Sequence, residues 1–145
     1  ASAFYISMVN QLNNISQSLE YISKMCNDHV LNNHSKLRYT QLRDLREIKE
    51  QFEENIFNQT ADSLKGLSQE GITALLDRKD RLESIITEKI DSHVQDIRNE
   101  DSSPKNTTLY FSLLLESKDF LNAVTSLITE YYKSYEENVE APLKL

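Results

Sequence analysis

Residues 4–32 read FYISMVNQLNNISQSLEYISKMCNDHVLN, and the apolar positions in this stretch recur at alternating steps of four and three. The series consists of Met8, Leu12, Ile15, Leu19, Ile22 and Cys26. This spacing gathers side chains on one stripe of an α-helix, whereas a β-strand would scatter them over both faces. The stretch therefore predicts a helix over residues 3–32, and we expect the rest of the chain to cover its apolar stripe.

Three later segments repeat the helical period, and they predict helices over residues 39–64, 69–99 and 106–135. Thr40 is expected to cap the first of them. The expected inward positions are Leu42, Leu45, Ile48, Phe52 and Ile56, then Leu75, Leu82, Ile86, Ile90, Val94 and Ile97, then Leu109, Leu113, Phe120, Val124, Leu127 and Tyr131. Leu114, Leu115, Leu121 and Ile128 widen the last stripe, so we expect the last helix to be the most buried.

Turn-forming residues separate the predicted helices. Both glycines fall within residues 66–71, and Pro104 follows a polar run at residues 99–103. Short connectors make consecutive helices antiparallel. The sequence therefore predicts an all-α fold, an antiparallel up-down-up-down four-helix bundle, with a single domain at residues 1–136 and a frayed tail at residues 137–145.

Composition narrows the classes of partner. The formal net charge is −7, which argues against nucleic acid and against direct binding to anionic lipid, since both need a clustered basic surface. No apolar run reaches the roughly 18 residues that a transmembrane helix needs. The chain opens at Ala1 without a methionine, so we expect it to be a fragment of a longer protein.

Sequence signatures of enzymes are missing. The whole chain contains two glycines, which excludes a phosphate-binding glycine-rich loop. Cys26 lies on the apolar stripe, so we interpret it as a packed thiol rather than a nucleophile paired with His29. A di-iron centre needs Glu-x-x-His pairs, but the residues three before the histidines are Cys26, Leu31 and Ile90. We therefore expect a non-enzymatic protein.

Carboxylates beside two apolar stripes leave a weaker case for a metal. Glu20 lies on the first predicted helix, and Glu116 and Asp119 lie in the middle of the last one. These oxygen ligands could converge on a hard cation. The alternative is that they are boundary residues that reach water or pair with Lys24 and Lys118.

Three tyrosines close the last predicted helix, at Tyr131, Tyr132 and Tyr135. Tyrosine suits half-wet interfaces, so the cluster could form a contact surface. It could equally close the end of the hydrophobic core. The sequence leaves both interpretations open.

Two short stretches resemble a known family. Residues 19–26 read LEYISKMC and residues 115–120 read LESKDF. Both are similar to the Leu-Glu-Arg-Ile-Gly-Asp type of helix that marks PhoU-like domains. The wider frame, from residues 4–10 to the last tyrosines, resembles the cytoplasmic C-terminal region of bacterial sodium/phosphate cotransporters, where a PhoU-like domain follows the last membrane span.

The family's metal motif, a carboxylate followed four residues later by an aspartate, is altered here. Lys24 follows Glu20 at that distance and Phe120 follows Glu116, with Asp119 one residue short. A lysine ammonium would repel a cation. The resemblance therefore implies the family's fold with its divalent or ferric metal clusters lost, and any surviving site would use Glu20, Glu116 and Asp119.

The resemblance also implies a role. We expect a regulatory domain of a sodium-dependent phosphate transporter, at the cytoplasmic face of the bacterial inner membrane. Its partners would be the membrane-spanning portion of the same chain and, since PhoU-like domains often self-associate, a second copy. The alternative is a free-standing helical adaptor or PhoU-type signalling protein.

Overall fold

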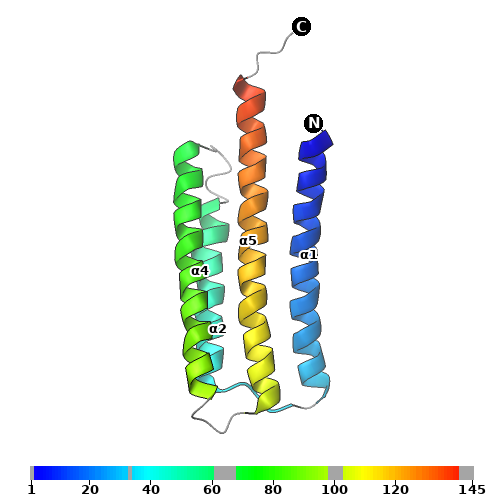
Figure 1. Cartoon of the computed structure of the whole chain (residues 1–145), viewed down its shortest axis with the longest axis vertical. Coiled ribbons are helices and arrows are strands. Elements are labelled where there is room, and N and C mark those ends of the chain that lie inside the picture. The colour runs from blue at the N-terminus through cyan, green and yellow to red at the C-terminus, as the bar shows by residue number, and fades with distance from the viewer. Residues whose placement is uncertain (1, 33, 61–67, 98–102, 141–145) are drawn as a thin grey trace.

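The computed structural model describes residues 2–32, 34–60, 68–97 and 103–140, and the described chain is helical throughout apart from its short connectors. The elements are α1 (Ser2–Leu31), α2 (Tyr39–Gln51), the π-helix η1 (Phe52–Asn58), α4 (Gln69–Ile97) and α5 (Pro104–Glu140). Figure 1 shows α1, α2, α4 and α5 lying side by side with alternating directions. The predicted antiparallel four-helix bundle is confirmed.

Local chemistry explains where helices begin. The Ser68 hydroxyl accepts a hydrogen bond from the Gly71 N–H at 3.1 Å, so Ser68 caps α4 and Gly71 lies inside that helix. Pro104 opens α5, since proline needs no N–H partner at the first helical position. Thr40 does not cap α2, because the helix begins at Tyr39 and the Gln41 Oε1 accepts the N–H of Arg38 at 2.9 Å.

Two predicted boundaries need correction. The helix predicted over residues 39–64 is not regular, because Phe52–Asn58 form a π-helix, and residues 61–64 lie outside the described residues. Arg78 Nε donates to the backbone carbonyl of Asn55 within η1 at 2.7 Å, which ties this wider turn to α4. The predicted frayed tail is wrong for residues 137–140, because α5 continues to Glu140.

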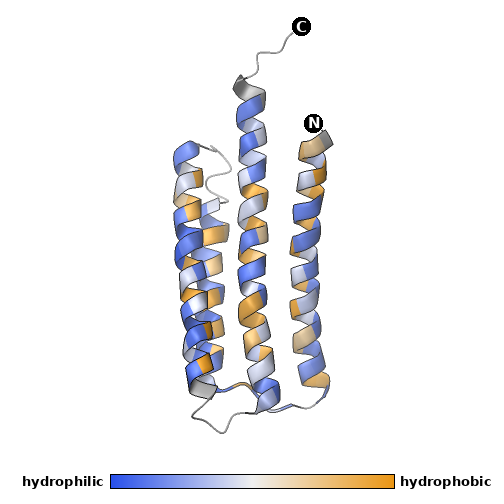
Figure 2. Ribbon diagram, viewed as in Figure 1, coloured by the Kyte–Doolittle hydropathy of each residue, from blue (hydrophilic) through white to orange (hydrophobic). Residues whose placement is uncertain are grey.

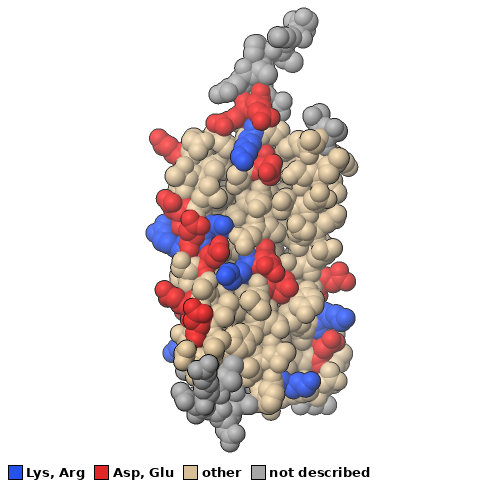
Figure 3. Space-filling view, in the orientation of Figure 1, with Lys and Arg blue, Asp and Glu red and all other residues tan. Residues whose placement is uncertain are grey.

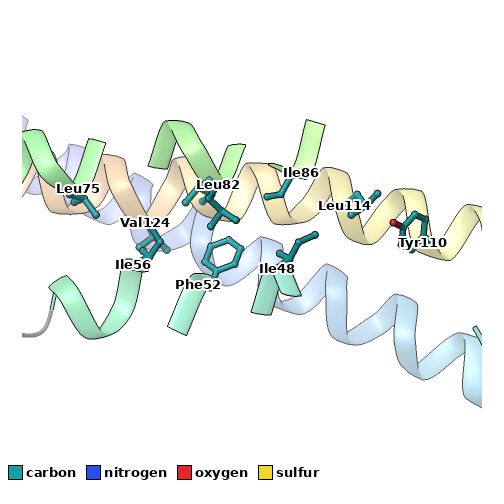
Figure 4. Packing of buried hydrophobic residues seen from close by; sticks show 10 residues of the cluster. Ile48, Phe52, Ile56, Leu75, Leu82, Ile86, Tyr110, Leu114 and Val124 are labelled. Carbon is teal, nitrogen blue, oxygen red and sulfur yellow. The ribbon is translucent and has the colours of Figure 1, made fainter. Parts of the chain in front are cut away.

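The hydrophobic core is built by three of the four helices. Its fully buried members come from α2 with η1, α4 and α5, and they meet in the centre of Figure 4. They are Ile48, Phe52, Ile56, Leu75, Leu82, Ile86, Tyr110, Leu114, Leu121 and Val124. As predicted, α5 is the most buried helix. Leu114 and Leu121, expected only to widen its stripe, are 0% exposed, while Leu115 is 53% exposed.

The expectation that the chain covers the stripe of α1 is met only in part, because Met8, Ile15, Ile22 and Cys26 are half-buried while Leu12 and Leu19 are exposed. Among the described residues, α1 contributes no side chain to the buried hydrophobic core, and its one buried side chain is Ser18. The reason is topological: α1 packs extensively on α5 and only weakly on the other helices. A helix with one neighbour covers one side of its apolar stripe and leaves the other side open.

Candidate functional site: the outer stripe of helix α1

The exposed side of α1 carries apolar residues at a regular helical spacing. Tyr5, Val9, Leu12 and Leu19 recur at steps of four, three and seven, and we call them the outer stripe. Their exposed fractions run from 36% at Val9 to 68% at Tyr5. Leu12 and Leu19 were expected to point into the core. They are instead 53% and 48% exposed, respectively.

The outer stripe lies in a stretch without formal charge. Residues 2–19 contain no Asp, Glu, Lys or Arg, although 27% of the chain is charged. Polar positions between the apolar ones are Ser, Asn and Gln. Figure 3 shows the consequence, a surface without charged side chains over the upper part of α1, at the right of the view. Apolar side chains set among uncharged polar ones are typical of the centre of a protein interface.

Figure 2 shows how the apolar residues are divided between helices. They occur on all four helices, but several of the large apolar side chains of α5 are buried, whereas those of α1 are half-buried or exposed among the described residues. Of the large hydrophobic side chains that are exposed among the described residues, α1 supplies Tyr5, Ile6, Val9, Leu12, Leu19, Tyr21, Val30 and Leu31. No other helix exposes so many among the described residues, so α1 carries the largest share of the exposed apolar surface.

A polar groove of about 540 Å³ runs between α1 and α5 on the other side of α1. Glu116 and Asp119 line it from α5, opposite the side chains of Gln11, Asn14 and Tyr21. Glu116 is half-buried and Asp119 is exposed. The groove therefore holds two carboxylates against neutral amides, with no basic side chain in its lining.

The predicted metal ligands meet only in part. Glu116 and Asp119 share the groove, but Glu20 is exposed and is not part of its lining. Within the described ranges, no three His, Cys, Asp or Glu side chains come close enough together to hold a metal ion. The structure therefore brings together two of the three residues, and the metal site stays a prediction.

Cys26 and the nearby histidines form no catalytic pair among the contacts of the described chain. Burial raises the pKa of the half-buried Cys26 thiol, which disfavours the thiolate form. His29 Nε2 lies 3.0 Å from the carbonyl oxygen of Ser35, and its ring packs on His34. These contacts close the turn after α1, and the interpretation of Cys26 as a packed thiol stays a prediction.

The three tyrosines near the end of α5 differ in burial, so each of the two interpretations fits part of the cluster. Tyr132 is 4% exposed and closes the end of the core, while Tyr131 and Tyr135 are exposed on the same helix. The exposed pair adds aromatic surface near the end of α5.

A charged network that the sequence does not indicate connects α2, α4 and α5. Lys89 Nζ lies 2.7 Å from Glu47 Oε2 and 3.3 Å from Asp44 Oδ1, and the Tyr110 hydroxyl donates to Asp44 Oδ2 at 2.8 Å. Burial by itself lowers the pKa of Lys89, but the hydrogen bonds and charges of Glu47 and Asp44 outweigh it and raise this pKa above its ordinary value. No spacing rule joins residues 44, 89 and 110, so only the fold reveals the network.

Comparison with protein-family models, with curated proteins and with solved structures gives no match. No helix in the described part of the chain is long and apolar enough to cross a membrane.

Proposed function

We propose that this chain is a non-enzymatic regulatory domain that pairs with a second copy of itself through the outer stripe of α1. The observation that carries the proposal is that α1 contributes no fully buried hydrophobic side chain to the described core, which it meets only through the half-buried Ile15, yet exposes Tyr5, Val9, Leu12 and Leu19 in a charge-free stretch. A regular stripe with steps of four and three fits against another helix as in a coiled coil.

Charge favours a second copy as the occupant of the stripe. Each chain carries a formal charge of −7, so two copies repel wherever their charged surfaces meet. Residues 2–19 form the stretch where two chains can approach without burying like charges.

The resemblance to PhoU-like domains supplies the process that the domain would regulate. It rests on residues 19–26 and 115–120, and an antiparallel bundle of four helices is compatible with it. On this proposal the regulated partner is the membrane-spanning portion of a sodium-dependent phosphate transporter in the bacterial inner membrane. The pair of domains would transmit a signal to that portion through helix contacts.

Two variants matched in exposure test the pairing. Leu12 and Leu115 are each 53% exposed, but Leu12 lies on the outer stripe and Leu115 lies on α5. We expect the unmodified chain to dimerise at about 1–100 μM, the Leu12→Glu variant to be monomeric, and the Leu115→Glu variant to remain a dimer. Sedimentation velocity gives the mass. A monomeric unmodified chain at about 100 μM, or equal loss of dimer in both variants, contradicts the pairing.

Transport assays test the regulatory role separately. In a well-expressed parent transporter, removal of the domain should change how phosphate uptake responds to phosphate supply while uptake itself continues. Leu12→Glu should reproduce part of that change, and Leu115→Glu should not. Complete loss of uptake in a correctly inserted truncation would contradict a purely regulatory role. A parent gene without membrane spans would instead favour the free-standing adaptor.

A further inference from the structure

A second hollow lies away from α1, where the start of α2 meets α4 and α5. Its volume is about 740 Å³, within the usual range for small-molecule sites. The first turn of α2 forms one wall with Tyr39, Thr40 and Gln41, and the opposite wall includes Glu88 and His93 of α4. No residue of α1 lines it, so its use is independent of what binds the outer stripe.

One buried donor in this hollow is unused. Gln41 is 4% exposed, and its Oε1 accepts the N–H of Arg38 at 2.9 Å. Because a backbone N–H can only donate, this bond fixes which end of the amide is oxygen. The Nε2 at the other end is buried, and no side chain or backbone group of the described residues forms a hydrogen bond with it. Such a group costs free energy unless something supplies an acceptor.

The surroundings of Gln41 favour an anion as that acceptor. Tyr39 and Thr40 belong to the first turn of α2, where backbone N–H groups and the positive end of the helix dipole face outward. Arg38 and Arg43 also line the hollow. Guanidinium and amide N–H groups together bind carboxylate and phosphate oxygens.

The acidic side chains in the lining of the hollow limit how much negative charge a ligand can carry. Asp44 and Glu47 are held by Lys89, and Tyr110 donates to Asp44, so these carboxylates are already bonded. With Glu88, three acidic side chains balance the cations of Arg38, Arg43 and Lys89 in the lining. A lining without net positive charge suits a single negative charge better than the two charges of a phosphate ester.

We propose that the hollow is a binding site for a small organic monocarboxylate, with its carboxylate at the start of α2 and hydrogen-bonded to Gln41 Nε2. Hydroxyl or amino groups on the same ligand would face Glu88. The site would let a small metabolite bias the packing of α2 against α4 and α5, because its walls come from all three core helices.

The test uses the full chain with lactate, glycine and succinate as probes, and with inorganic phosphate and chloride at matched ionic strength. Titration is followed by the side-chain amide signals in nitrogen–proton NMR spectra. We expect lactate or glycine to shift the Gln41 amide signals at millimolar concentration or below, and phosphate and chloride to shift them at least about tenfold more weakly.

Gln41→Glu provides the matched variant, since its carboxylate can still accept the Arg38 N–H while it repels an anion. Gln11→Glu, in the groove between α1 and α5, introduces the same charge elsewhere. We expect Gln41→Glu to weaken binding about tenfold or more, and Gln11→Glu to leave it unchanged. The proposal is overturned if no carboxylate binds by about 10 mM, if phosphate or chloride binds as well, or if Gln41→Glu binds normally while its spectrum shows a folded chain.

Discussion

Replacing Leu114 by alanine tests whether the core is built by α2, α4 and α5 rather than around α1. Leu114 is 0% exposed at the centre of the core cluster, so truncation removes buried methyl groups and leaves a cavity. Leucine-to-alanine changes at such sites cost about 3 kcal/mol of unfolding free energy. For a domain of this size that corresponds to a fall of about 10 °C in Tm.

Two leucine-to-alanine variants at half-exposed positions serve as controls for this effect. Leu115 is the next residue on the same helix, and Leu12 belongs to the apolar stripe of α1 that the sequence places in the core. Each is 53% exposed. Half-exposed leucines lose less contact area, and alanine has the higher helix propensity, so we expect each change to cost less than about 1 kcal/mol.

The chain contains no tryptophan, so its unfolding cannot be followed by tryptophan fluorescence. Urea and thermal unfolding are instead followed by far-ultraviolet circular dichroism. Because Leu12 is also assigned to the pairing surface, the Leu12→Ala variant is compared at two protein concentrations. A loss at Leu12 equal to that at Leu114, at both concentrations, would refute the description of the core. So would a loss below about 1 kcal/mol at Leu114.

Two further predictions concern titratable groups. The folded state holds the Lys89 proton more tightly than the unfolded state, so this group's stabilising contribution is complete below the ordinary lysine pKa of about 10.4 and is lost as pH rises through the higher folded value. Lys89→Met should cost about 1–3 kcal/mol at neutral pH, because it removes the ammonium group that contacts both Glu47 and Asp44 and leaves Asp44 with Arg43 and Tyr110 alone among the described residues. It should also remove that alkaline loss from urea titrations, and an unchanged alkaline limb would contradict the assignment. Because burial raises the pKa of the Cys26 thiol, iodoacetamide should alkylate the native chain at neutral pH more slowly than the urea-unfolded chain, and equal rates would show an exposed thiolate.

The sequence by itself determined the helices and their order. Apolar spacing located all four long segments, and Pro104 located the start of α5, because helical periodicity and backbone restrictions are local properties. Gly71 was a misleading signal, since it lies inside α4. Local reasoning also placed Ile48, Leu82 and Ile86 correctly in the core. It failed at Phe52–Asn58, since a π-helix leaves no spacing signal that distinguishes it from a regular turn.

Tertiary structure alone decided which apolar stripe is buried. A stripe on α1 predicts that a partner is needed, but it does not say whether the partner lies within the chain; here α5 covers one side, and Leu12 and Leu19 remain half exposed. The absence of charge in residues 2–19 was visible in the sequence and was the available signal for an interface. Gln41, Lys89 and Tyr110 gave no such signal, because the burial of a polar group and its partners depends on helices that meet from distant parts of the chain.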